Sequence, residues 1–140
     1  MRPIETPIGL QLGRTAKAVS RAFDAALAEA GGSLPLWLVL VSLKQEPRGT
    51  QLEIARAMGI EGATLTRHLD GFERAGYVVR RRDAGDRRAV RVELTPAGEQ
   101  MFATLRDAAM AFNRRLTGDL SEAELTRLRR TLSRLEASVQ

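Results

Sequence analysis

The segment TQLEIARAMGIEGATLTRHLDGFERAG, which runs from Thr50 to Gly76, carries the clearest fold signal in this 140-residue chain. Thr50 followed three residues later by Glu53 is the pattern of a capping box, and it predicts a short helix that continues through Met58 and ends at Gly59. A second helix is expected after a tight connection, with Gly76 as its C-terminal cap. Two short helices joined by a glycine turn are the helix-turn-helix arrangement.

The second helix of this pair, expected to follow the connection at Ile60-Glu61 and to run to about Ala75, separates apolar from polar residues. Its inward stripe has the four-and-three spacing of a helix and consists of Leu65, Leu69 and Phe72. Its opposite side is small and polar and consists of Ala63, Arg67, Asp70 and Arg74, flanked by Thr64 and Thr66. Gly62 and Ala63 let the start of the helix approach DNA closely, and the fork of Arg67 suits a guanine or a phosphate. Taken alone, the pattern also fits an ordinary helical hairpin.

A β-hairpin is predicted directly after this helix. Tyr77–Arg82 and Val90–Leu94 are rich in strand-forming residues, and the turn-forming segment Asp83–Asp86 lies between them. Six arginines fall between Arg80 and Arg91. They would repel one another in a core, so we expect them to face solvent or a polyanion, and a thin arginine-tipped ribbon fits a DNA minor groove. A mobile hairpin whose charges serve solubility is the alternative.

One spacing in the hairpin singles out a particular arginine. Asp86 lies two residues before Arg88, which is close enough for its carboxylate to accept a hydrogen bond and hold that guanidinium in one direction. Arg88 is therefore the predicted groove contact, and the other five arginines are expected to face phosphates or solvent.

Helices are also predicted on the N-terminal side of this region. Apolar residues recur at helical spacing from Ile8 to Ala30, and Gly31-Gly32 ends that helix. Ser33 or Pro35 then opens a second helix, whose stretch Leu36–Val41 is apolar on every side. A helix of that kind is expected to be buried centrally.

Two more helices are predicted after the hairpin. Thr95-Pro96 opens the first, and the capping box of Ser121 and Glu124 opens the second. The last helix carries apolar residues at alternating three and four spacing, as in a two-helix seam: Leu125, Leu128, Leu132, Leu135 and Val139. The expected fold is mainly α, an α+β winged helix, in one domain over residues 1–140.

Composition narrows the classes of function. The chain has a net charge of +5 and no cysteine, so disulfides, thiolate metal sites and thiol nucleophiles are excluded. The single histidine, His68, lacks the partners that a metal site needs, and the acid pairs lie at a helix start and a turn tip. No apolar run approaches the ~20 residues of a membrane span. We expect a cytoplasmic protein that is not an enzyme and needs no metal or cofactor.

Two segments, Gln51–Gly76 and Asp86–Gly98, resemble the MarR family of bacterial regulators. The strongest element is Asp86-x-Arg88-x-x-x-Val92-x-Leu94-Thr95, which is similar to the wing signature of that family. Gly59-Ile-Glu and Thr64-Leu-Thr-Arg-His-Leu-Asp70 look most like its SlyA branch.

The resemblance implies a homodimeric repressor on a pseudo-palindromic operator. Residues 33–95 would form the winged-helix part, and residues 1–32 and 96–140 the dimerisation helices. One helix would lie in a major groove and the wing in the adjacent minor groove. The residues expected to bind DNA are Ala63, Thr64, Thr66, Arg67, Asp86, Arg87 and Arg88, with Asp86 as the salt-bridged partner of Arg88. Glu61 departs from the family, because many relatives have a serine as N-cap at that position.

The resemblance also implies an effector, since many relatives are released from DNA by small anionic aromatic compounds. Trp37 matches a tryptophan that lines the effector site in the SlyA branch, and Arg67 could face ligand or DNA. The alternative for Trp37 is a core aromatic on a buried helix. For the whole chain, the alternative is a winged-helix module that contacts an acidic protein without sequence-specific DNA binding.

Overall fold

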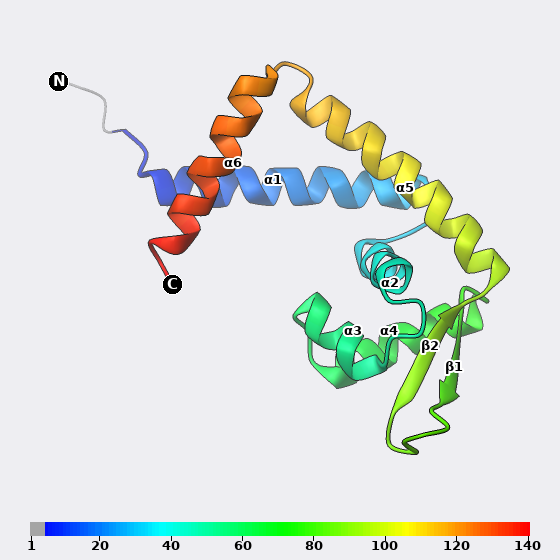
Figure 1. The fold of residues 1–140 in the computed structure, drawn as a ribbon. Helices are drawn as coiled ribbons and strands as arrows, with labels where there is room; N and C mark the ends of the chain where they lie inside the picture. The colour runs from blue at the N-terminus through cyan, green and yellow to red at the C-terminus, as the bar shows by residue number, and fades with distance from the viewer. Residues whose placement is uncertain (1–4) are drawn as a thin grey trace. The chain divides into compact units, whose positions relative to one another are not determined.

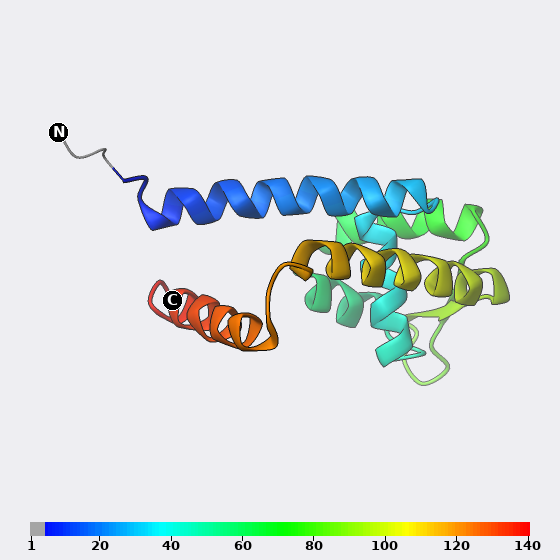
Figure 2. The same cartoon turned by 90° about the horizontal axis from the view of Figure 1, so that it is seen from above.

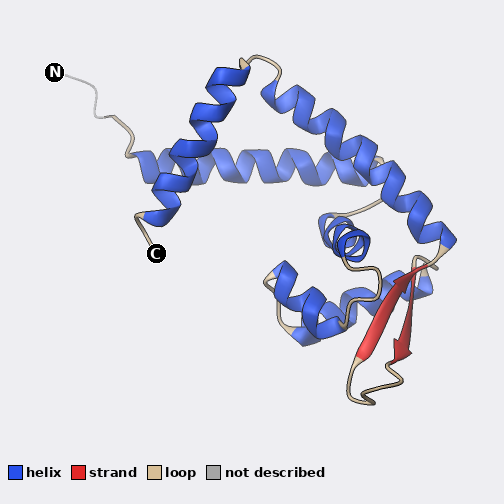
Figure 3. Ribbon diagram, viewed as in Figure 1, coloured by secondary structure: helices blue, strands red, loops and turns tan. Residues whose placement is uncertain are grey.

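The structure, a computed structural model, describes residues 5–140 and is mainly helical, with one small antiparallel sheet (Figures 1 and 3). The elements in chain order are α1 (Ile8–Glu29), α2 (Leu34–Gln45), α3 (Gln51–Met58), α4 (Gly62–Arg74), β1 (Val78–Arg82), β2 (Val90–Leu94), α5 (Pro96–Thr117) and α6 (Glu122–Ala137). This is the predicted winged-helix fold. Its contacts form two compact units, one that extends to Ala109 and one that covers Met110–Gln140.

Local capping signals place the helix ends as predicted. Thr50 and Glu53 form a complete capping box at the start of α3, and Gly59 ends that helix at a left-handed φ of 67°. Gly76, which follows the end of α4, has a φ of 86°. Glycine is favoured at both positions because a Cβ is strained in this conformation. α1 is a long unbroken helix (Figure 2).

Helix α2 is shared by two buried clusters in the first unit. Val39 and Leu43 pack with residues of α3, α4, β1 and β2. Leu36 and Leu40 pack with Leu27 of α1 and with residues of α5. The prediction of a centrally buried helix is confirmed, although Leu38 on the same helix is exposed.

The strands β1 and β2 form an antiparallel hairpin in which Val78 lies opposite Leu94 and Arg82 opposite Val90. A contact that we did not predict anchors its base. The Val92 N–H donates to the Gly49 carbonyl at 3.0 Å, and Thr50 forms an isolated β-bridge with Arg91. The turn between α2 and α3 thus acts as a short third strand beside β2.

The second unit contains the end of α5 and the whole of α6. Ser121 and Glu124 form the predicted capping box at the start of α6. None of the residues of α6 is buried, and its leucines Leu128 and Leu132 are 45% and 41% exposed. The apolar seam of this helix therefore includes two exposed leucines, while Leu125 and Leu135 are half-buried.

No single helix in the described residues is long and apolar enough to cross a membrane. α1 and α2 pass that test only as a pair, and they are bent by 79° at the break between them.

Candidate nucleic-acid interface

The start of α4 is an open, sparsely covered helix end. Its N-cap Glu61 makes no side-chain capping bond, as expected for a glutamate at this position. Gly62 and Ala63 are exposed, and among the described residues no atom lies within 4 Å of the position of a Cβ on Gly62, apart from its chain neighbours and the backbone of α4. Another macromolecule can approach this backbone closely.

Arg67 lies one turn further along α4 and is exposed. Among the described residues, it forms neither an ion pair nor a hydrogen bond through its side chain. Leu65 and Leu69 on the opposite stripe are completely buried. The predicted division of α4 into a core stripe and an outer stripe is confirmed, and it leaves the guanidinium of Arg67 available.

Thr64 and Thr66 are both half-buried. The Thr66 hydroxyl donates to the Gly62 carbonyl at 3.0 Å and accepts a bond from Gln51 Nε2 at 3.3 Å. This links the first turn of α4 to the start of α3. Thr66 therefore supports the geometry of the two helices, a role that its position in the sequence did not indicate.

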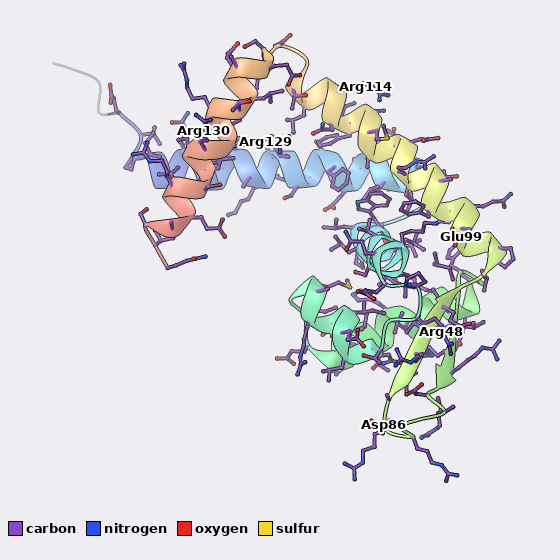
Figure 4. The ribbon with its side chains drawn as sticks, in the orientation of Figure 1. Arg48, Asp86, Glu99, Arg114, Arg129 and Arg130 are labelled. Atoms are coloured by element: carbon purple, nitrogen blue, oxygen red, sulfur yellow. The ribbon has the colours of Figure 1, made fainter. Side chains whose placement is uncertain are left out.

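The wing exposes four of its six arginines. Arg81 and Arg82 lie at the end of β1, and Arg87 and Arg88 lie in the loop that joins the strands. Figure 4 shows Asp86 at the tip of the hairpin, with nitrogen-bearing side chains projecting beyond it. In the part of the chain that the structure describes, the guanidinium groups of Arg87 and Arg88 have no hydrogen-bond or ion-pair partner.

The expected contact between Asp86 and the Arg88 guanidinium is not formed within the described residues. Asp86 Oδ1 instead accepts a hydrogen bond from the Arg88 backbone N–H at 2.9 Å. An aspartate commonly bonds the backbone two residues ahead, because its short side chain can close a local turn. Asp86 thus shapes the loop and leaves the Arg88 side chain unpaired.

The expectation that all six arginines face solvent or phosphate is wrong for two of them. Arg80 Nη2 lies 2.6 Å from Asp70 Oδ1 and 3.0 Å from Glu73 Oε1, both on α4. Arg91 Nε donates to Asp83 Oδ1 at 3.1 Å, and its Nη1 donates to the Arg48 carbonyl at 2.6 Å. Acidic and carbonyl partners offset the repulsion that an inward-facing arginine would otherwise meet.

These bonds shift the ionisation of the groups involved. The pKa of Glu73 is lowered, chiefly because its carboxylate accepts a hydrogen bond from the Arg80 backbone N–H and, next, from the Arg80 guanidinium. Burial lowers the pKa of Arg80, but the bonds to Asp70 and Glu73 outweigh it and raise the pKa overall. Both groups are therefore held in their charged forms.

A groove of about 560 Å³ runs between the wing and the helix pair. It is lined on one side by wing residues that include Asp86 and Arg88, and on the other by residues of α3 and α4 that include Leu52 and Thr66. Leu52 is 60% exposed. The groove brings the wing arginine and the first turns of both helices onto one surface.

Trp37 lies in a different place from this surface. Its ring stacks on Phe102 of α5 at 5.6 Å, and Lys44 and Arg106 lie over the Phe102 ring at 5.3 and 5.9 Å. Trp37 is half-buried against the core cluster of α1, α2 and α5. Arg67 takes part in none of these contacts, so the structure does not bring the two predicted ligand residues together. Phe102, Lys44 and Arg106 were not predicted as neighbours of Trp37.

His68 stacks on Phe72 at 6.0 Å and is half-buried. This contact agrees with a packing role. Within residues 5–140, no group of three or more histidine or acidic side chains could hold a metal ion.

Comparison with known proteins identifies a family model and solved structures to which this chain is similar. A sequence model of the MarR family matches residues 33–90. A MarR-family transcriptional regulator from a Rhodococcus species is similar at a TM-score of 0.78 and 26% identity, over 91% of each chain. The regulator MosR of Mycobacterium tuberculosis, solved in complex with DNA, is similar at a TM-score of 0.74 and 25% identity, over 96% of each chain. A mutant MarR from Escherichia coli, complexed with operator DNA, shares the fold at a TM-score of 0.82 and 23% identity, over 92% of this chain and 93% of that one.

Proposed function

We propose that the chain is a transcription regulator of the MarR family, whose sequence model matches residues 33–90, and that it is a homodimeric repressor that binds double-stranded DNA at a pseudo-palindromic operator. The observation that carries the proposal is that α4 and the wing both expose arginines whose side chains are unpaired among the described residues: Arg67 on α4, and Arg87 and Arg88 on the wing. Arg88 also lines the groove that the wing forms with the first turns of α3 and α4. Two relatives solved with DNA support it. Whether the chain lies in the SlyA-like branch of the family stays a prediction.

The two elements are suited to different parts of the duplex. A helix with small residues at its start and an arginine one turn later fits a major groove, where a guanine offers two acceptors to a guanidinium fork. A thin hairpin with arginines at its tip fits the narrower minor groove, where the negative potential is concentrated. We propose that α4 reads bases through Arg67 and that Arg88 enters the minor groove.

The homodimer is supported by apolar surface that the single chain leaves uncovered. Leu128 and Leu132 of the α6 seam are exposed, and so are Ile8 and Leu12 on α1. Exposed seams of this kind are typical of helices that pack against a second copy. A two-fold dimer would place two α4 helices in successive major grooves, and its half-sites would lie about 10 base pairs apart.

We further propose that a small aromatic carboxylate acts as effector at the Trp37 cluster. The stacked rings offer an aromatic surface, and Lys44 and Arg106 supply positive charge beside it. An aromatic carboxylate at ~100 times its dissociation constant should stabilise the folded protein by about 2.7 kcal/mol in a thermal-shift series. The variant Phe102→Ala should abolish that shift. If no benzoate in the series raised the melting temperature, the protein would instead be a DNA binder that no such effector regulates.

The DNA-binding proposal is tested by titrating labelled duplexes at several salt concentrations, first with the unmodified chain. One duplex is selected from a random-sequence pool, and the other is unrelated and of equal length. Arg88→Ala should weaken binding to both and flatten the salt dependence by about 0.9 in slope for each phosphate that it no longer neutralises. Arg67→Ala should weaken the selected duplex more than the unrelated one, by about 1–3 kcal/mol.

The control is Arg129→Ala, which removes the same charge from α6 (Figure 4). If all three variants lowered the slope equally, the DNA-binding residues would be assigned to the wrong elements. Failure of the unmodified chain to bind any duplex would favour a winged-helix module that contacts an acidic protein.

A further inference from the structure

The bonds that Arg80 makes connect two elements that the proposed function uses separately. β1 carries Arg80 at its centre, and α4 carries Asp70 and Glu73 one turn apart. Besides the two ion pairs, Arg80 Nε donates to Glu73 Oε1 at 3.3 Å and the Arg80 backbone N–H donates to Glu73 Oε2 at 2.8 Å. One residue of the wing is thus bonded four times to two carboxylates of the recognition helix.

Arg80 is poorly placed to bind DNA itself. Its side chain is 20% exposed, whereas that of Arg81 beside it is 67% exposed. Its outer nitrogen Nη2 is already shared between two carboxylates. Releasing it toward a phosphate would leave Asp70 and Glu73 unpaired beside the DNA, which costs electrostatic free energy.

The other side of the wing has its own attachment. Arg91 bonds Asp83 and the Arg48 carbonyl, so it ties β2 to the turn between α2 and α3. Arg80 and Arg91 do not lie opposite each other in the sheet, because Arg80 pairs with Val92 and Arg91 with Arg81. They therefore point to opposite faces of the hairpin. The wing is held from two sides, and the side that faces α4 is held by Arg80.

We propose that Arg80 is a positioning residue that fixes the angle between α4 and the wing, so that Arg67 and Arg88 reach one duplex at the same time. This inference rests on the proposed DNA binding. Rigid presentation saves the ordering cost that two independently moving elements would meet on binding. It predicts that the contacts of Arg67 and Arg88 are energetically coupled, and that the coupling depends on Arg80.

The first test needs no DNA and uses the absence of cysteine in the chain. Nitroxide labels on Ala63→Cys and Ala84→Cys, both at exposed positions, report the distance from α4 to the wing by pulsed electron resonance. Labelled protein is diluted with unlabelled protein. Arg80→Met keeps the apolar stem and should broaden the distance distribution, while Arg81→Met should leave it narrow. An unchanged distribution in Arg80→Met overturns the inference.

The second test is a double-mutant cycle of Arg67→Ala and Arg88→Ala on the selected duplex, with Arg80 intact and with Arg80→Met. With Arg80 intact, the losses of binding free energy caused by Arg67→Ala and Arg88→Ala should be non-additive. Arg80→Met should lower the affinity about tenfold and make these two losses additive. The salt dependence of DNA binding should be the same for Arg80→Met as for the unmodified chain. A slope that is lower by the amount expected for one phosphate contact would show that Arg80 binds DNA directly, which would contradict the inference. Arg80→Lys, which keeps the charge but not the fork, should recover part of the affinity.

Asp70→Asn provides a variant that folds even if Arg80→Met does not, because the Asp70 side chain is 49% exposed. It removes the ion pair between Asp70 and Arg80. It should therefore broaden the distribution of label distances and weaken the energetic coupling between Arg67 and Arg88, as Arg80→Met does. Normal distances and full coupling in Asp70→Asn would contradict the inference. A chain with a rigid wing that binds no duplex would instead mark failure of the proposed function.

Discussion

Gly98 lies in the first turn of α5, where its Cα faces the backbone of the residue that precedes β1. A Cβ built on Gly98 would overlap the Tyr77 carbonyl oxygen and lie 3.1 Å from Leu94 Cδ2. The backbone N–H of Gly98 is bonded to Thr95 Oγ1, and the Thr95 hydroxyl donates to the Gly76 carbonyl. The helix start is thus pressed against the end of the hairpin, and only glycine fits there.

We predict that Gly98→Ala destabilises the fold by about 1–3 kcal/mol, because a rigid backbone atom has to move to admit the methyl group. Urea unfolding followed by circular dichroism measures this directly. Gly71→Ala is the matched control, since in residues 5–140 no atom apart from its chain neighbours and the backbone of α4 lies within 4 Å of its Cβ position. That change should stabilise the helix by up to about 1 kcal/mol. Equal effects of the two changes would contradict the close packing at Gly98.

Glu73 gives a pH-dependent contribution to stability. Its pKa is lowered in the folded state by the hydrogen bonds from Arg80. A lowered pKa stabilises the fold above the unfolded-state pKa of about 4.3, and this contribution is lost as the pH falls through the folded-state pKa. We predict that Glu73→Gln is less stable than the unmodified chain at pH 7 and that the difference shrinks below about pH 4. A difference independent of pH between 3 and 7 on urea titration would rule out this ionic contribution.

Residue roles were predictable where a local pattern determines them. The buried stripe of α4 and the exposure of Arg67 follow from helical periodicity. The role of Arg80 was missed, although strand alternation carries a signal for it. Arg80 lies two residues after the fully buried Val78, so its side chain starts on the inner face of β1. Which acids it meets there depends on the packing of α4, which the sequence pattern alone does not encode.

At the level of helices and strands, the ends were predicted well because their signals are local. The capping boxes at Thr50 and Ser121 and the glycines after α3 and α4 lie where the chain turns. The pairing of Gly49 and Thr50 with β2 was not predicted. It joins residues about forty positions apart in the sequence, and neither turn-forming residues nor helical or strand periodicity predicts a contact between residues so far apart.

The exposed leucines of the α6 seam lead to a prediction about the oligomeric state of the chain. Leu128 and Leu132 lie one turn apart on this seam. Leu128→Asp together with Leu132→Asp should convert the dimer into monomers, because two carboxylates would be buried without partners at the proposed interface. Sedimentation velocity at micromolar concentration measures the mass. Ser133→Asp, which lies off the seam on the same helix, should keep the dimer.

A dimer that persists with both aspartates would place the subunit contact elsewhere. A monomeric unmodified chain would contradict the proposed assembly. Either result would leave the winged-helix unit itself unaffected, since α6 lies in the second compact unit of the chain.

For the chain as a whole, the winged-helix fold and the match to the MarR family model over residues 33–90 were predictable from two segments, the helix pair at Gln51–Gly76 and the wing at Asp86–Gly98. The arrangement of side chains at the surface was less predictable from the sequence. The pairing of Asp86 with the Arg88 backbone and the cluster around Trp37 both depend on which neighbours the tertiary fold supplies. Of the six wing arginines, Arg80 and Arg91 are bonded to other elements of the fold, and the remaining four are exposed.

The proposed two-fold engagement of one duplex is tested most directly by hydroxyl-radical footprinting of the unmodified chain on the selected duplex. We predict two protected regions related by a dyad, with centres about 10 base pairs apart for the α4 helices and flanking minor-groove protection from the wings. Arg88→Ala should remove the flanking protection and leave the central pair. A single protected region, or protection that Arg88→Ala does not change, would contradict the proposed mode of binding.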